Sequence, residues 1–463
     1  MPKSLGKDKS GIQRTMKRRD FFGDSMGQFA LNAMSGLIGQ MTYFYTDKVG
    51  VAAGAVATIL MICKIIDAFT DLIMGNIVDH TKPGKERYRP WLVKAGIPAG
   101  ILTVMMFTVP KGSSVLQIAY LLITNLLFTA VAYTAVCIPY ASLQIVRTNS
   151  QEERGRMGIW RSAAGYISGM IIAIAIIPIT NMLGGTQSAW IKFGVMAGAL
   201  ILLSFLICYA TSKETVQGEE EVEEIIAEEE AVPFQEAIVK LFHNKYWVMI
   251  LIMNFMVNVL YGINGASGSF YAKYIYGNDN LTGIMGAVGV IPTLLGFILV
   301  GVMIKKMGVT KTLKVSFVIG FVSNIVRVIN PYHFGFNVLM GCFSTFANIP
   351  MMCLMGVLSA MAIDYNEYKY GVRMVASSQA ASSFGCKVGS GIGASVIGWC
   401  LAIAAYNPTS EVATAATKQA IFTFSIYIPA LMFLVLFIMT LKFDLEKRLP
   451  KLKEEIEKRK EES

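Results

Sequence analysis

The sequence has little charge for its length. Charged residues make up 16% of its 463 residues and hydrophobic residues 54%, whereas an average globular chain carries roughly 25% charged residues. The charges gather in short blocks between long apolar runs. A soluble, disordered, collagen-like or coiled-coil protein is therefore excluded, and the pattern indicates a polytopic membrane protein. The net charge of +10 needs no nucleic-acid partner, because basic residues on cytoplasmic loops explain it.

The sequence also lacks the motifs of metal centres and membrane enzymes. Its seven cysteines fall within or at the ends of apolar segments, without a CxxC pair or a neighbouring histidine cluster. They are interpreted as buried thiols, not as a disulfide framework. The absence of HExxH and of paired histidines argues against an enzyme. No cofactor is expected apart from a coupling cation.

About twelve apolar stretches are long enough to cross a bilayer, since roughly 20 apolar residues span a hydrocarbon core of about 30 Å. Six precede and six follow a glutamate-rich segment, which is the layout of two pseudo-symmetric bundles with a substrate site near the membrane midplane. The predicted fold is therefore all-α. The expected centres lie near Leu37, Ile65, Leu102, Thr124, Ile167, Leu202, Val257, Ile291, Ile319, Met351, Ile392 and Phe433. The expected parts are a basic N-terminus (1–22), a first bundle (23–212), an acidic linker (213–245), a second bundle (246–442) and a tail (443–463).

Basic residues fall in alternate loops and at both ends of the chain, for example Lys82, Arg87, Lys305 and Lys306. Lys and Arg near span ends stay preferentially in the cytoplasm. We therefore expect a multi-pass protein of the plasma membrane with both termini in the cytoplasm. The acidic linker is most simply a solvated segment followed by a short amphipathic helix, and the tail is most simply a solvated cytoplasmic helix. A basic partner or cations for the linker, and anionic lipid for the tail, are the less favoured alternatives.

The second span carries three charges on one helical face, Lys64, Asp67 and Asp71. Each costs at least about 2.5 kcal/mol at mid-membrane depth, and two carboxylates on one face repel unless a cation or a proton lies between them. This predicts a cation site, with Asp67 and Asp71 as the Na⁺ ligands if sodium is the coupling ion. The alternative is that Lys64 neutralises Asp67 while Asp71 reaches water. Lys387, in span eleven, also needs a carboxylate partner, and the acids of span two are the obvious ones.

Polar and aromatic side chains in other spans suit a polyhydroxylated ligand. Span four places Tyr133, Thr134 and Cys137 near one face, and span five opens with Arg161. Taken singly, such residues are more often interhelical hydrogen-bond partners than ligand contacts. Arg161 could equally be an anchor at the cytoplasmic end of its span.

Several segments together resemble the glycoside-pentoside-hexuronide:cation symporter family of the major facilitator superfamily. They are FFGDSMGQF, YFYTDKVG, KIIDAFTDLIMGNIVDHTKPGKERYRPW, YTAVCIPYASL and IDYNEYKYGVR. The resemblance implies a transporter of two six-helix bundles that moves a sugar or sugar derivative with Na⁺, Li⁺ or H⁺ by alternating access. It implies neither an enzyme nor a nucleic-acid partner, and we expect a functional monomer in the lipid bilayer.

The resemblance and the polar pattern together suggest three groups of site residues. The cation site is expected at Asp67, Asp71 and Thr134. The substrate site is expected at Gln28, Tyr133, Cys137, Arg161, Ser383 and Lys387. Gating is expected of Asp79, Arg87, Asp364, Glu367 and Arg373.

This chain departs from the melibiose branch of the family at the sugar site. Cys137 stands where that branch has an aspartate, which disfavours a galactoside. The acidic ligand of the first span is not obvious either, and Gln28 is the nearest polar match, with Asn32 one turn on. A hexuronide becomes more plausible, because fixed carboxylates would repel it. Thr70 replaces an asparagine between the two cation-site acids, so the coupling ion stays open.

The predicted function is symport of a sugar glycoside or hexuronide with a monovalent cation. Proton-coupled export of small apolar or cationic compounds remains the alternative from the same fold, since the 27 Met and 26 Phe residues suit a large apolar cavity. A receptor or scaffold that transports nothing would leave the charged face of span two without a purpose.

Overall fold

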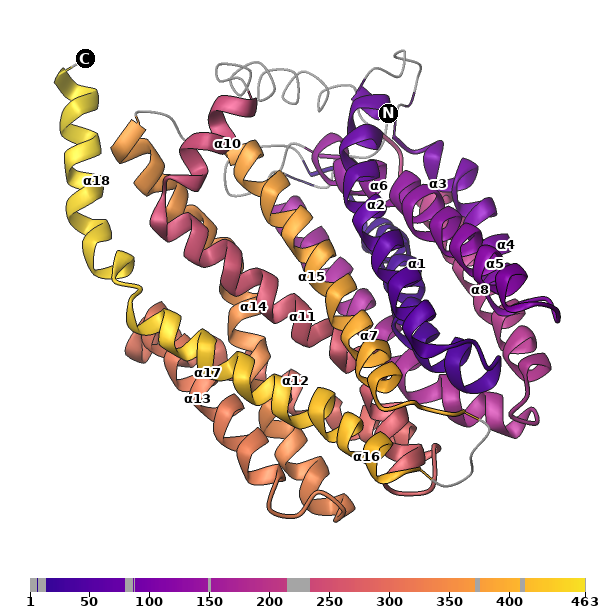
Figure 1. The fold of residues 1–463 in the computed structure, drawn as a ribbon. Helices are drawn as coiled ribbons and strands as arrows, with labels where there is room; N and C mark the ends of the chain where they lie inside the picture. The colour runs from indigo at the N-terminus through magenta and orange to yellow at the C-terminus, as the bar shows by residue number, and fades with distance from the viewer. Residues whose placement is uncertain are drawn as a thin grey trace. The chain divides into compact units, whose positions relative to one another are not determined.

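The computed structural model describes residues 6, 14–79, 86, 88–148, 151–214, 234–370, 375–408 and 413–462, and these contain helices and no strand. They form two compact units, Met1–Glu228 and Glu229–Ser463 (Figure 1). The helices of the first unit are α1 (Arg18–Tyr43), η1 (Phe44–Lys48), α2 (Ala53–Asp79), α3 (Trp91–Lys94), α4 (Gly96–Phe107), α5 (Ser114–Leu126), η2 (Leu127–Tyr133), α6 (Thr134–Val146), α7 (Gln151–Met182) and α8 (Gln187–Thr211). Those of the second are α10 (Phe234–Phe242), α11 (Lys245–Tyr274), α12 (Leu281–Met307), α13 (Val309–Arg327), α14 (Phe334–Tyr370), α15 (Val375–Ile403), α16 (Ala415–Phe422), η3 (Thr423–Tyr427), α17 (Ile428–Leu441) and α18 (Leu445–Glu462).

Ten helical stretches among the described residues are long and apolar enough to cross a membrane. Helix α1 and the shorter apolar segment Trp91–Phe107 lie at two further predicted centres. The all-α polytopic class is thus confirmed, and the predicted number of twelve spans is compatible with the structure. Most of the predicted acidic linker, residues 215–233, lies outside the described residues.

Large apolar side chains face outward on the long helices. On α12, Ile291, Leu294 and Ile298 are 59%, 56% and 68% exposed. Such a contiguous apolar surface is unfavourable in water, but a helix satisfies its backbone hydrogen bonds internally and can present it to lipid. The exposed face therefore agrees with the membrane location that the composition predicts.

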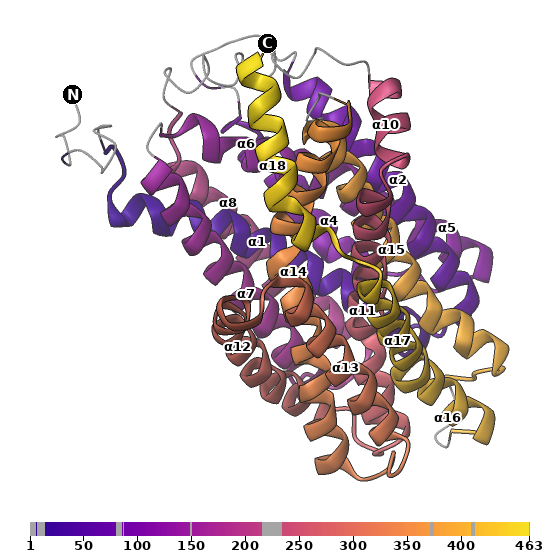
Figure 2. The ribbon, with the colours of Figure 1, turned by 90° about the vertical axis from the view of Figure 1, so that its left-hand side faces the viewer.

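In the first unit, α2 packs against the π-helical turn of span four, η2. Helix α1 packs on α7 and α8, α4 packs on α8, and α2 packs on α5, η2 and α6 (Figures 1 and 2). The segment η2 is a π-helix that ends at Tyr133, immediately before Thr134. A π-helical turn holds one residue more than an α-turn and is frequent at functional sites. It therefore changes which side chains of span four face α2.

The second unit is built on a core shared by α11, α13, α14 and α17. Helix α13 packs on α14 and α17, and α12 packs on α14 (Figure 2). The core includes Trp247, Phe317, Leu358 and Phe433, each at most 3% exposed. At one end of this core, Gly308 separates α12 from α13 with a φ of 81°, a left-handed conformation that favours glycine.

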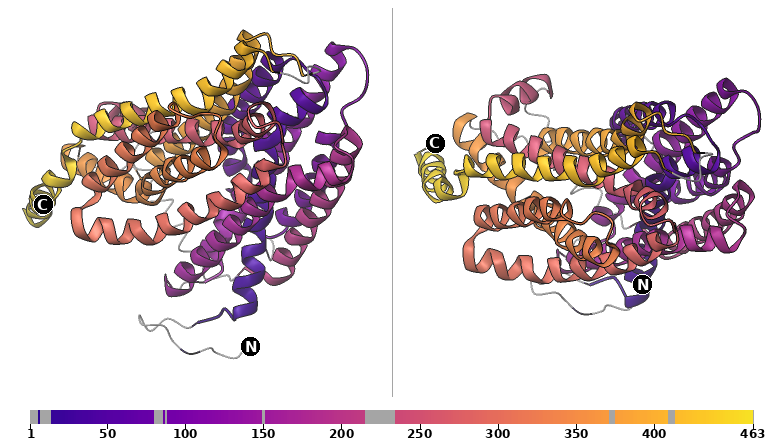
Figure 3. Two further views of the ribbon diagram at one scale, coloured as in Figure 1. Left: turned by 90° about the horizontal axis from the view of Figure 1, so that it is seen from below. Right: turned by 60° about the horizontal axis from the view of Figure 1, so that its bottom comes forward.

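The tail helix α18 packs on this unit instead of lying fully in solvent. Figure 3 shows it leaving the end of α17 at an angle. Leu445 and Leu452, which share one helical face, are 0% and 8% exposed within the core. The Glu446 carboxylate accepts hydrogen bonds of 2.7 Å from the backbone N–H groups of Val309 and Thr310. These amides begin α13, so Glu446 satisfies donors that the helix itself cannot.

Glycines allow α11 and α15 to cross in close contact. A Cβ at Gly262 would overlap the backbone oxygen of Ser390, and one at Gly393 would overlap that of Val259. We expect Gly393→Ala to lower the free energy of unfolding by about 1–3 kcal/mol, because neither backbone can yield easily. Thermal unfolding of the purified protein in detergent measures the effect. Gly268→Ala on α11 is the control, since nothing lies within 4 Å of its Cβ position; equal melting of the two variants would contradict this packing.

Candidate functional site

The three residues predicted for the cation site meet in the structure. The Thr134 hydroxyl oxygen lies 3.0 Å from Asp67 Oδ1 and 2.9 Å from Asp71 Oδ1. Asp67 is 0% exposed and Thr134 1% exposed. A hydroxyl carries a single proton, so Thr134 can donate to only one of the two carboxylates at a time. A monovalent cation or an added proton at this point would relieve the repulsion between them.

Lys64 contacts the Asp67 carboxylate of the same cluster through its second oxygen. Its Nζ lies 3.5 Å from Asp67 Oδ2, and its side chain is 21% exposed. Asp67 therefore presents one oxygen to Lys64 and the other to Thr134. The Lys64–Asp67 ion pair is the contact that the alternative interpretation expects, whereas the half-buried Asp71 also contacts Thr134.

The π-helical turn of span four accounts for the position of Thr134. Helix α2 contacts both η2 and α6, and Thr134 is the first residue after η2. Its hydroxyl also lies 3.3 Å from the Thr129 backbone oxygen, five residues earlier. In contrast, the Thr70 hydroxyl donates to the backbone oxygen of Asp67 at 3.0 Å. Thr70 thus bonds its own helix, whereas the family's asparagine would offer an amide at this position.

A cavity of about 310 Å³ adjoins span four in the first unit. Four of the predicted substrate residues line it together: Gln28 from α1, Tyr133 from η2, Cys137 from α6 and Arg161 from α7. The other lining residues are Leu31, Tyr140, Ala141, Gln144, Gly158 and Ser162. Aromatic faces with a few amide, hydroxyl and guanidinium groups are the surroundings that small polar ligands need. The volume lies at the lower end of the usual range for such sites, roughly 300–1,000 Å³.

Arg161 is held by a buried acid that the sequence analysis did not assign. Its Nε lies 2.7 Å from Asp24 Oδ2 and its Nη2 3.0 Å from Asp24 Oδ1. Arg147 Nη1 lies 3.0 Å from the same Oδ1. The Arg161 guanidinium also stacks on the Tyr140 ring, 3.9 Å from its centre, and the Tyr140 hydroxyl donates to the backbone oxygen of Asp24 at 2.8 Å. Two guanidinium groups therefore share one carboxylate that is 0% exposed.

The first span therefore does carry an acid near the cavity, although the sequence made none obvious. Asp24 lies one turn before Gln28, and it binds Arg161, which lines the cavity. Gln28 itself donates to Asn32 at 2.7 Å. Arg161 is 7% exposed, so it is not a solvated end anchor. A buried arginine requires a carboxylate partner, and that requirement is the signal that could have found Asp24.

The remaining substrate residues and two of the gating residues belong to the second unit. Ser383 and Lys387 lie on α15, exposed and half-buried respectively, and Asp364 and Glu367 lie half-buried on α14. Because Asp67 and Asp71 belong to the first unit, the pairing of Lys387 with them stays a prediction.

Three further gating residues cannot be placed in detail. Arg87 and Arg373 lie outside the described residues, and Asp79 is the last residue of α2, with its side chain also outside the description. Their gating role stays a prediction.

The fold and the site define a helical membrane transporter in which a buried acid, Asp67, and a half-buried one, Asp71, lie beside a polar cavity. Residues 23–447 match the MFS/sugar transport protein family, and the chain belongs to that family. This confirms the predicted resemblance and the major facilitator fold. The family is one of transporters and not of enzymes, as the sequence predicts.

Individual relatives cover most of the chain. The isoprimeverose transporter of Lactiplantibacillus pentosus is 25% identical over 448 residues, which are 95% of this chain and 91% of the relative. The glucuronide carrier protein homolog of Escherichia coli (strain K12) is 26% identical over 409 residues, 85% of this chain and 86% of the relative. Among solved structures, a D-xylose-proton symporter has a TM-score of 0.64 at 11% identity and covers 92% of this chain and 97% of its own; this likeness concerns the fold.

Proposed function

We propose that the protein is a secondary active symporter that takes up a sugar glycoside or hexuronide together with Na⁺, Li⁺ or H⁺ by alternating access. One observation carries the proposal. Tyr133 lines the polar cavity, while the next residue, Thr134, lies within 3.0 Å of both Asp67 and Asp71. The substrate site and the cation site therefore share one turn of span four.

The shared turn supplies a physical route for coupling. A cation between Asp67 and Asp71 removes their repulsion and fixes the Thr134 hydroxyl. It thereby orders Tyr133 and Cys137, whose side chains contact the substrate. Each ligand then binds more tightly when the other is present, and this coupling is reciprocal. Release of both ligands on the other side of the membrane lets the empty carrier return, with Lys387 replacing the missing cation.

The charge around Arg161 favours a hexuronide over a neutral glycoside. Asp24 is shared between Arg161 and Arg147, so a second negative charge beside these guanidinium groups would be attracted. A hexuronide carries such a charge as a carboxylate, which forms charge-assisted hydrogen bonds with guanidinium groups. The name of the glucuronide carrier relative agrees with this choice, and that of the isoprimeverose transporter with a neutral glycoside.

We further place the protein in the plasma membrane as a monomer, with both termini in the cytoplasm. The support for this orientation is the concentration of Lys and Arg in alternate loops, which positions those loops on the cytoplasmic side.

The native thiol of Cys137 tests the shared turn. We expect a bound substrate to slow alkylation of Cys137 by N-ethylmaleimide at least fivefold, because Cys137 lines the cavity. A coupling cation should lower the substrate concentration needed for this protection. The measurement is peptide mass spectrometry of the purified protein after timed alkylation, with a series of glycosides and glucuronides as probes.

Cys400, half-buried on α15 in the second unit, is the internal control and should react at an unchanged rate. In Asp71→Asn the cation effect should disappear while protection at saturating substrate persists. If each candidate cation leaves the protection of Cys137 by substrate unchanged, the proposed coupling is overturned. Failure of all probes to protect it would overturn the substrate site.

A further inference from the structure

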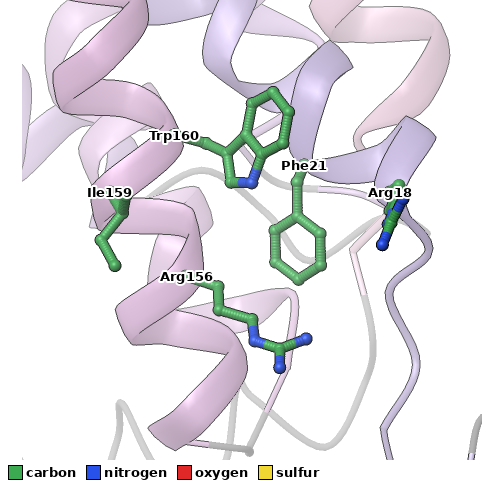
Figure 4. Close-up of a pocket in the computed structure, with 5 residues that line it drawn as sticks. All are labelled: Arg18, Phe21, Arg156, Ile159 and Trp160. Atoms are coloured by element: carbon green, nitrogen blue, oxygen red, sulfur yellow. The ribbon is translucent and has the colours of Figure 1, made fainter.

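A second cavity, of about 320 Å³, lies between the beginnings of α1 and α7 in the first unit. It is lined by Arg18, Phe21, Arg156, Ile159 and Trp160. Figure 4 shows the Phe21 ring at its centre, Trp160 beside it, and the side chains of Arg18 and Arg156 on two other sides. Both arginines are exposed, so the cavity opens to the surface with two cationic groups at its rim.

Each of the two helices passes from basic to exposed apolar residues at this point. On α7, Arg156 begins the apolar stretch Arg156–Met182, and Ile159 and Trp160 are 70% and 41% exposed. On α1, Arg18 is the first residue, and Phe22 is 51% exposed. Basic residues followed by an exposed tryptophan are typical of the boundary between lipid headgroups and hydrocarbon. This pattern predicts that the cavity lies at the membrane interface.

The wall on the side of α1 is fixed by buried contacts. Phe21 packs with Met16 and Met157 in a small core in which no member is more than 8% exposed. The buried Glu153 carboxylate accepts hydrogen bonds from the backbone N–H of Thr15 at 3.1 Å and of Met16 at 2.9 Å. These bonds hold the segment that leads into α1 against α7. The groove is thus formed before any ligand binds.

We propose that this groove binds an acidic phospholipid, with its phosphate between the guanidinium groups of Arg18 and Arg156 and an acyl chain along Ile159 and Trp160. Guanidinium groups bind phosphate oxygens through charge-assisted, often paired hydrogen bonds. Exposed aromatic and aliphatic surface in the same groove requires an apolar occupant, which a free phosphate ion lacks. A zwitterionic headgroup would bring an ammonium group to two arginines, so an acidic lipid is favoured.

The site is distinct from the sugar cavity, although the two share a turn of α7. Trp160 lines the lipid groove, whereas Arg161 lines the sugar cavity and binds Asp24. The orientation that the basic loops predict places the groove in the cytoplasmic leaflet, where anionic lipids attract such residues.

Native mass spectrometry of the purified protein in detergent tests the proposal. The probes are phosphatidylglycerol and phosphatidylcholine of equal chain length at equal concentration. We expect the wild type to retain phosphatidylglycerol preferentially. In Arg18→Gln with Arg156→Gln this preference should fall at least about tenfold, since the two guanidinium groups that hold the phosphate are removed. Lys305→Gln with Lys306→Gln is the matched control, because it removes two exposed basic residues from the last turn of α12.

A second measurement locates the lipid. Phosphatidylglycerol brominated on its acyl chain should quench the fluorescence of the wild type more than that of Trp160→Phe, because bromine quenches a tryptophan only on contact. Arg18→Lys with Arg156→Lys should keep most of the preference, which separates loss of charge from loss of folding. An unchanged preference in the Gln variant, an equal loss in the Lys305 and Lys306 control, or equal quenching in Trp160→Phe would each overturn the proposal.

Discussion

Asp71→Asn and Asp67→Asn are each expected to abolish gradient-driven accumulation of substrate, with uptake at least 100-fold below that of the wild type. Either change removes one of the two carboxylates that face the Thr134 hydroxyl. The remaining single carboxylate needs no cation to relieve repulsion, so the cation gradient no longer drives the transport cycle. Initial uptake rates into proteoliposomes, with and without the gradient, measure the effect.

Asp20→Asn is the control for this pair. Asp20 lies in the first turn of α1 and accepts a hydrogen bond of 2.8 Å from the Lys17 backbone N–H, away from the cation cluster. Its loss removes a carboxylate from the same unit without touching α2. Accumulation should stay near the wild-type level. Normal accumulation by the Asp67 or Asp71 variant, at equal expression, would contradict the assignment of the cation site.

Asp24→Asn is expected to lower the free energy of unfolding by about 3–5 kcal/mol, the usual cost of breaking a buried ion pair by removing one partner. The change leaves Arg147 and Arg161, which are 4% and 7% exposed, without their shared carboxylate. Arg161→Gln should cost less, because Arg147 still neutralises Asp24 at 3.0 Å. Thermal unfolding in detergent, followed by size-exclusion recovery of the heated sample, reports both variants.

The double variant makes this test specific. Asp24→Asn combined with Arg161→Gln should be more stable than the sum of the single effects, since the second change removes one of the two uncompensated charges. Glu236→Gln serves as the surface control. Its carboxylate pairs with Lys240 at 2.7 Å but is 54% exposed, and such pairs contribute less than about 1 kcal/mol. Equal melting of Asp24→Asn and Glu236→Gln would contradict the role of Asp24.

The elements of this fold that follow from local composition could be predicted. In a membrane, a run of about 20 apolar residues can pair its backbone hydrogen-bonding groups only by forming a spanning helix. The predicted span centres accordingly all fall within helices. The spacing of Asp67 and Asp71 by four residues places both on one face of any helix. Their cluster was therefore predictable before its partners were known.

Other features depend on contacts between distant segments. Thr134 is expected at the cation site only from the family resemblance. It reaches the acids of α2 after the π-helix Leu127–Tyr133, and no composition signal marks such a turn. The role of Asp24 depends on its ion pair with Arg161, which lies 137 positions away in the chain. The tail could be predicted as a helix, but the burial of Leu445 and Leu452 depends on an apolar surface that α13, α14 and α17 form together.

The central claim, that a cation gradient drives uptake of a sugar through this protein, is tested most directly by transport into proteoliposomes. A radiolabelled series of neutral glycosides, pentosides and glucuronides would be offered with an inward Na⁺ gradient, with an inward Li⁺ gradient, with a pH gradient and with none. The account predicts that at least one compound, with a glucuronide favoured, accumulates above equilibrium under one gradient only, and that Asp71→Asn loses this accumulation. Equal uptake of every compound with and without each gradient would contradict it.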